Sequence, residues 1–137
     1  MKRGKACVLM AVVLWIAPAG ARADTRPEYM RRLALLLDWS HRGVGWVESN
    51  IEDRALGRAA QAIAERYVEV AGRMLPPAEL RALHPHVILI VENAERACHF
   101  ASVANMRDFN HHVRILREEE RILLEFLRTS HIELPRM

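Results

Sequence analysis

Cysteine is scarce in this chain of 137 residues, which has two, and this scarcity excludes a fold held together by disulfide bonds. Cys7 lies in the N-terminal segment that we expect to be removed, so Cys98 remains alone and no bridge can form within the chain. An unpaired cysteine in an oxidising compartment is typically buried or else links two copies. The core must therefore come from the packing of apolar side chains.

Long apolar runs are also lacking. The longest, residues 6–17, has 12 residues, whereas a membrane-spanning helix needs about 20. Basic residues precede this run, Pro18 to Gly20 interrupt it, and residues 21–23, Ala-Arg-Ala, form a small-x-small cleavage site. This order is typical of a secretory signal peptide. We therefore expect residues 1–23 to be a leader and residues 24–137 to form one domain in the periplasm or outside the cell. Whether the leader is cut or kept as an anchor stays open.

An excess of positive charge is absent once the leader is set aside. The chain has 20 basic and 17 acidic residues, and the leader holds four of the basic residues but none of the acidic ones. The remaining 16 basic residues are balanced by the 17 acidic ones. Nucleic-acid binding requires a concentrated basic surface, so this function is excluded.

Strand patterns, in which apolar and polar residues alternate between turns, are missing as well. Apolar residues instead recur at helical spacing, for example Ile63, Tyr67 and Val70 on the expected core face of the second helix. The predicted helices run from Thr25 to a turn at residues 50–53, from there to about Leu75, from His84 to near Asn105, and from a cap at Asp108 to about Thr129. Short connections favour antiparallel neighbours. We therefore predict an all-α, up-down-up-down antiparallel four-helix bundle.

Two polar residues share the apolar side of the fourth predicted helix. His112 and Glu119 are seven residues apart, which places them nearly one above the other. Helical bundles build metal sites from inward Glu and His side chains, so this pair is a candidate site for a divalent transition metal, with His41 and His86 as further histidines. The alternative is that both are ordinary polar groups with protein partners, since buried polar groups are usually hydrogen-bonded.

Haem is the other cofactor that the sequence suggests. Residues 95–99 resemble a haem-attachment motif that lacks its first cysteine, so covalent haem is not expected. The layout resembles the periplasmic four-helix cytochromes, whose b-type members have an axial Met early in the first helix and an axial His late in the fourth. Met30 matches the early position. The position that matches the axial His is Leu124, and His131 lies two turns later.

A second apolar stripe, Leu35, Trp39 and Trp46, lies away from the core face of the first predicted helix, with Gly43 between the tryptophans. Tryptophan is enriched at protein interfaces. The stripe is therefore a candidate surface for a protein partner, most simply a second copy in a two-fold dimer. Alternatively, the rings fold over the edge of the bundle.

Catalytic patterns are absent from the sequence, which has no nucleophile–base arrangement, phosphate-binding loop or redox pair of cysteines. Ser40 lies on the core face of the first predicted helix, where we expect its hydroxyl to bond to its own helix. We therefore predict a non-enzymatic exported binding protein, a protein-interaction module of the cell envelope. The alternative is a periplasmic carrier or sensor of metal or haem.

Overall fold

The computed structural model describes residues 22–136, so all but the last two positions of the predicted leader lie outside it. This part of the chain contains four long α-helices, one short 3-10 helix and no strand. Their bounds are α1 Arg26–Ser49, α2 Arg54–Arg73, η1 Ala78–Leu80, α3 His84–Ser102 and α4 Met106–Thr129. The all-α, helical-bundle prediction is confirmed. None of the helices in residues 22–136 is both long and apolar enough to cross a membrane.

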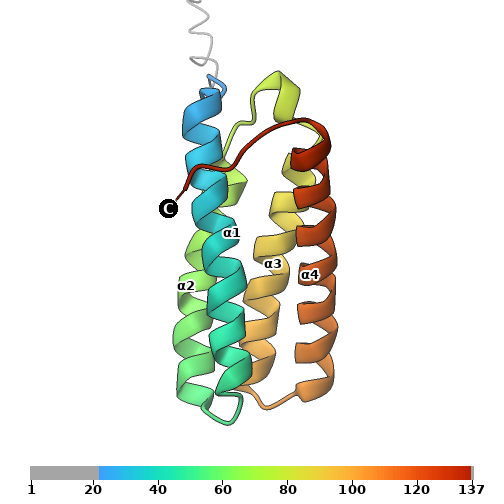
Figure 1. Ribbon diagram of the computed structural model, residues 1–137. Helices are drawn as coiled ribbons and strands as arrows, with labels where there is room; N and C mark the ends of the chain where they lie inside the picture. Colours follow the sequence, from blue (N-terminus) through green and yellow to red (C-terminus); the bar gives the residue numbers. More distant parts are fainter. Residues whose placement is uncertain (1–21, 137) are drawn as a thin grey trace, which may run out of the picture.

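The long helices lie side by side, and the segments that join consecutive helices lie at alternate ends of the molecule (Figure 1). Residues 50–53 and 103–105 are short connections, whereas residues 74–83 form a longer one that contains η1. Along the contact between α1 and α2, residue numbers rise on α1 while they fall on α2. The Asp24 amide donates to the Leu75 carbonyl at one end of α1 and α2, and the rings of Trp39 and Tyr67 meet further along.

The first helix begins where the sequence predicts, because its start is fixed by local interactions. Both the amide and the hydroxyl of Thr25 donate to Oε2 of Glu28, at 3.0 and 2.7 Å. Pro27 occupies the first turn, where its missing N–H costs nothing.

The α3–α4 boundary differs from the prediction. α3 ends at Ser102 rather than near Asn105, because Ala104 takes a left-handed backbone conformation with φ 58°. The prediction that Asp108 caps α4 is wrong. Asn105 is the cap, and its side-chain oxygen accepts from the Asp108 amide. Asp108 lies in the first turn, where a carboxylate favours the positive end of the helix dipole.

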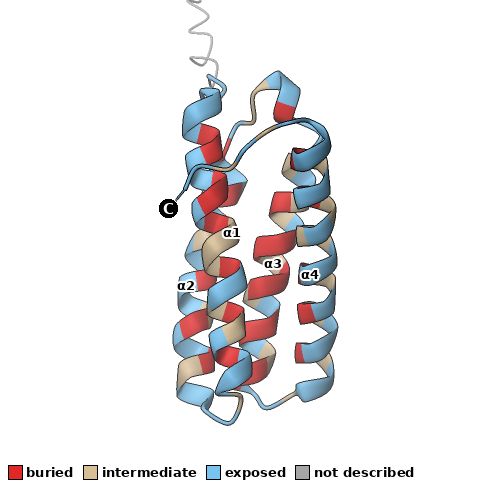
Figure 2. Ribbon diagram, in the orientation of Figure 1, coloured by how far each residue is buried: buried red, intermediate tan, exposed pale blue. Residues whose placement is uncertain are grey.

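α3 is the central helix of the bundle and packs against α1, α2 and α4. Buried residues follow its length and the inward faces of its neighbours (Figure 2). The α2–α3 contact is especially close, because a Cβ at Gly57 would lie 2.9 Å from the Ser102 backbone nitrogen. α1 and α4 have much less backbone contact with each other, and side chains bridge them instead.

Candidate functional site

Consecutive glutamates on α4 bind histidines on two different helices. Nδ1 of His86, on α3, lies 2.6 Å from Glu119 Oε2, and Nδ1 of His41, on α1, lies 3.3 Å from Glu120 Oε2. Both glutamate side chains are largely buried, with 16% and 12% exposed. Burial raises the pKa of Glu120, while His41 and Arg117 act in the opposite direction. These contacts hold α4 against both α3 and α1.

His112, also on α4, has a different partner. Its Nδ1 lies 2.8 Å from Oδ1 of Asn93, whose amide nitrogen donates to the Leu89 carbonyl. The bond to Leu89 identifies which end of the Asn93 amide is the nitrogen, so the atom that faces His112 is the oxygen. An amide oxygen can only accept a hydrogen bond, and therefore Nδ1 of His112 carries the proton. The imidazole also stacks on the Phe100 ring, with centroids 5.4 Å apart.

The surroundings of His112 disfavour its charged form. Burial lowers its pKa, and the positive charges of His111 and Arg96 lower it further, whereas Asp108 raises it. Since Nδ1 holds the proton in the neutral ring, Nε2 keeps a free lone pair.

The structure therefore separates the predicted pair. His112 and Glu119 are both partly buried, but His112 contacts Asn93 and Glu119 contacts His86. No group of three or more His, Cys, Asp or Glu residues within residues 22–136 is arranged to hold a metal ion. Asn93 and the pairing of His86 with Glu119 were not predicted, because helical spacing along one segment does not reveal its partners on another.

The haem candidates lie in contrasting environments. Met30 is 5% exposed and belongs to the core cluster. His131 is exposed just beyond α4, with a left-handed φ of 54°.

The predicted tryptophan stripe is divided between the bundle edge and the surface. Trp39 is partly buried and its ring packs against Tyr67 of α2, with centroids 4.9 Å apart. A Cβ at Gly43 would lie 3.0 Å from the Trp39 ring, so this glycine makes room for the indole. Leu35 and Trp46 remain 43% and 62% exposed. Trp39 thus covers the edge of the bundle, as the alternative predicted, while the other two face solvent.

Helix α2 extends this exposed stripe. Ile63 and Val70 are 47% and 40% exposed, and they flank Tyr67 at helical spacing. The prediction that they belong to the core face is wrong, because α2 turns its small residues Ala60, Ala64 and Ala71 inward instead. We define the α1–α2 apolar face as Leu35, Trp39, Trp46, Ile63, Tyr67 and Val70.

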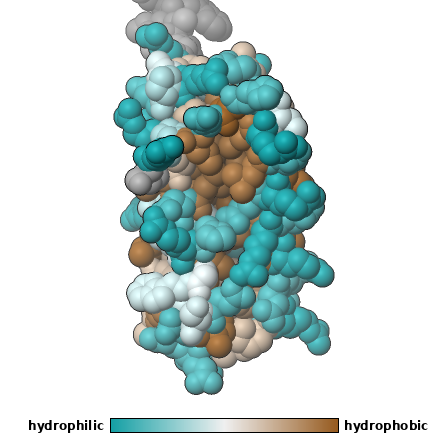
Figure 3. Space-filling view, in the orientation of Figure 1, coloured by the Kyte–Doolittle hydropathy of each residue, from teal (hydrophilic) through white to brown (hydrophobic). Residues whose placement is uncertain are grey.

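A groove of about 750 Å³ lies between α1 and α4, with lining residues also from the segment after α4. Its apolar lining residues are Ala34, Leu37, Leu124, Leu134 and Pro135, and its polar ones are Asp38, His41, Arg42, Glu120 and Arg136. Figure 3 shows a hydrophobic area between α1 and α4 in the upper part of the molecule. The sequence did not predict this groove.

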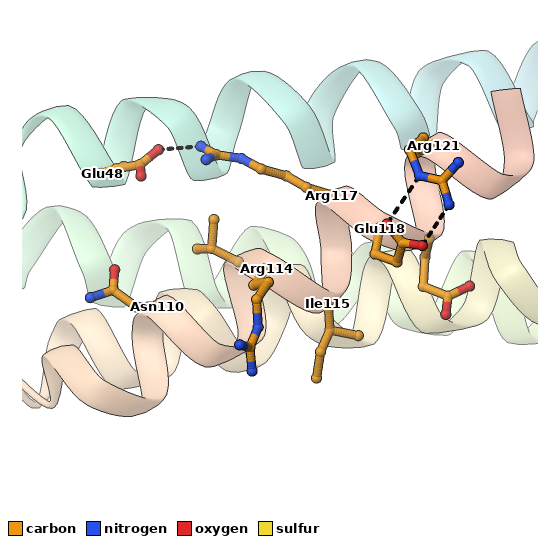
Figure 4. Close-up of a pocket in the computed structure, with 9 residues that line it drawn as sticks. Glu48, Asn110, Arg114, Ile115, Arg117, Glu118 and Arg121 are labelled. Atoms are coloured by element: carbon orange, nitrogen blue, oxygen red, sulfur yellow. Dashed lines mark hydrogen bonds and ion pairs between the residues drawn. The ribbon is translucent and has the colours of Figure 1, made fainter.

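A second hollow, along α4, is mostly charged. Arg117 reaches from α4 to Glu48 on α1, with Nη2 2.5 Å from Oε2, and Glu118 pairs with Arg121 on α4 itself (Figure 4).

No family model, curated protein or solved structure matches this chain.

Proposed function

We propose that this protein is a binding module of the cell envelope, exported to the periplasm or secreted, that acts without catalysis. Its partner surface is the α1–α2 apolar face, and its simplest partner is a second copy of the chain. The proposal includes a cleaved leader, residues 1–23, and the up-down-up-down helix order. Two short connections, residues 50–53 and 103–105, support that order, as do contacts in which residue numbers rise on α1 while they fall on α2.

The exposure of Trp46 is the observation that carries this proposal. An indole that is 62% exposed leaves a large apolar surface in water. It does not stand alone, because Leu35 lies on the same stripe and Ile63 and Val70 continue the face onto α2. Large apolar patches on a protein surface mark interaction sites.

The test is the self-association of the exported protein, measured by sedimentation over a range of concentrations. We expect Leu35→Ser with Trp46→Ser to weaken association at least tenfold, since buried tryptophans are frequent interface hot spots. Trp39 is left intact, because its loss would also remove the contact with Tyr67.

The matched control is Val103→Ser, which alters a residue that is 54% exposed but lies just beyond α3 and belongs to neither α1 nor α2. It should leave association unchanged. A wild-type chain that stays monomeric at millimolar concentration contradicts the proposal, and so does a double variant that associates like the wild type.

The second candidate function is the carriage of a divalent transition metal or haem. The observation in its favour is the pair of His–Glu contacts made by adjacent residues of α4, His86–Glu119 and His41–Glu120. The other predicted ligands are His112 for a metal, and Met30 with His131 for haem.

Elemental analysis and an absorption spectrum of the exported protein test this candidate. Bound metal at one equivalent that is lost in His86→Ala, or a haem band that is lost in Met30→Leu, supports it. A purified protein that carries neither group and binds neither on titration contradicts it.

A further inference from the structure

The chain reverses direction immediately after α4. His131 takes a left-handed conformation, its amide donates to the Arg128 carbonyl, and the Ile132 amide donates to the Leu127 carbonyl at 2.9 Å. These bonds satisfy carbonyls at the helix end and fix the direction in which the chain leaves. Residues 131–136, which we call the strap, then cross from α4 to α1 (Figure 1).

Alternate residues of the strap pack against the bundle. Ile132 and Leu134 are partly buried and pack against the core, whereas His131, Glu133 and Pro135 are exposed. An extended chain turns successive side chains to opposite sides, so one side of the strap enters the bundle and the other faces water.

The strap leaves much of its seat open. Leu134 and Pro135 line the groove together with Leu37 and Leu124, yet the remaining space is about 750 Å³ and Leu124 is 50% exposed. This volume lies within the range of known ligand sites.

Charges around the groove are largely matched by the protein itself. Arg42 makes two hydrogen bonds to Asp38, at 2.8 and 2.6 Å, and His41 contacts Glu120. A ligand that depends on a strong net charge would therefore find few unmatched charges here. Apolar side chains at alternate positions, as in the strap, fit the lining directly.

We propose that the groove between α1 and α4 binds an extended peptide segment of another protein, with apolar residues at alternate positions, and that the strap is its built-in competitor. This site is independent of the α1–α2 apolar face, because α1 contributes Ala34, Leu37 and His41 to the groove but Leu35, Trp39 and Trp46 to the face. A short tether gives the strap a local concentration in the millimolar range, so a partner peptide binds the closed chain weakly.

The experiment measures binding of a fluorescent peptide with the sequence of residues 131–136 by anisotropy. In the full chain, Ile132→Ser with Leu134→Ser unseats the strap, and we expect the peptide to bind this variant at least tenfold more tightly than the wild type. Glu133→Ser changes the exposed side of the strap and should bind like the wild type. The same peptide with serine in place of both apolar residues should not bind the unseated variant.

A further substitution locates the peptide. Adding Leu124→Glu to the unseated variant should abolish binding, because it places a charge on the groove lining. Equal affinity of the peptide for wild-type and unseated chains overturns the proposal, as does the absence of binding at millimolar peptide.

Hydrogen exchange of the wild-type chain keeps the proposal testable if the double variant loses its helical circular dichroism. Excess peptide should displace the strap and speed exchange of the Ile132 amide, which donates to Leu127. An unchanged exchange rate at saturating peptide would overturn the competition.

Discussion

At the scale of single residues, Ser40 on α1 places a hydroxyl group among apolar side chains of the core. Its side chain is completely buried, and within residues 22–136 its Oγ has no hydrogen-bond partner rather than a bond to its own helix. A buried hydroxyl without a partner costs about 1–3 kcal/mol. We therefore expect Ser40→Ala to raise the free energy of unfolding by about 1 kcal/mol, measured by denaturant unfolding.

Ser49→Ala is the control for Ser40. The Ser49 hydroxyl is exposed and donates to the Gly45 carbonyl, so its removal should change stability by less than about 0.5 kcal/mol. A Ser40→Ala protein less stable than the wild type would show that the hydroxyl has a partner after all.

Cys98 is the second residue with a specific expected behaviour. It is completely buried on α3, and burial, aided by the charge of Glu95, raises its pKa to about 12. The thiolate is the reactive form, so the native protein should not react with a thiol reagent or form a disulfide-linked dimer at neutral pH. In a Cys7→Ser background, labelling should appear only with denaturant, in step with the loss of helix. Rapid labelling without denaturant would be inconsistent with this burial.

The residues of the candidate site were predictable only in part. Helical spacing placed His112 and Glu119 on the apolar side of α4, and both side chains are partly buried and contact α3. It could not indicate that they bind Asn93 and His86, because partners depend on the register between two helices. That register is set by packing, and spacing within one helix does not encode it.

At the scale of the elements, predictions were most accurate where a boundary is fixed locally. The start of α1 follows from Thr25 and Glu28, which bond to each other. The start of α4 was misplaced because Asn105 and Asp108 are both good capping residues. The choice between them depends on Ala104, whose left-handed conformation no sequence rule would assign to alanine.

Two helical glycines should respond oppositely to alanine. At Gly57 a Cβ would lie 2.9 Å from a backbone atom of α3, so Gly57→Ala must push α2 and α3 apart and should destabilise the protein by about 1–3 kcal/mol. At Gly45 a Cβ would meet nothing within 4 Å, and Gly45→Ala should stabilise α1 by up to about 1 kcal/mol. Thermal unfolding of both variants checks the pair. Equal shifts in Tm would refute the close α2–α3 approach.

At the scale of the whole molecule, the bundle was predictable but its asymmetry was not. The apolar period of each segment specifies helices with a buried side. It does not specify that α2 buries mainly small residues, such as Ala60 and Ala64, and so lies close to α3. Nor does it reveal that α1 and α4 are joined by ion pairs and the strap. The two proposed binding surfaces arise because the neighbouring helices pack at unequal distances from one another.

The stability of the whole molecule should fall as the pH decreases from 7.5 to 5.5. Burial lowers the pKa of His84, with Asp24 opposing it, and also that of His112. A histidine whose pKa is lower in the folded state binds its proton more readily after unfolding. Its contribution to the free energy of unfolding is therefore complete at a pH above the unfolded pKa of about 6.5 and is lost as the pH falls below that value. Glu120 acts in the opposite sense, because its pKa is raised, but its titration starts from a more acidic value.

Denaturant unfolding at pH 5.5 and at pH 7.5 measures how the free energy of unfolding depends on pH. Histidine variants then show which side chains cause that dependence. Replacing His84 and His112 together by glutamine should flatten the dependence, since glutamine does not titrate. A wild-type protein as stable at pH 5.5 as at pH 7.5 would mean that both partly buried rings accept protons without loosening the contacts of α3 with α1 and α4. The histidines would then be part of the packing alone, and α4 would stay docked across the whole range of pH.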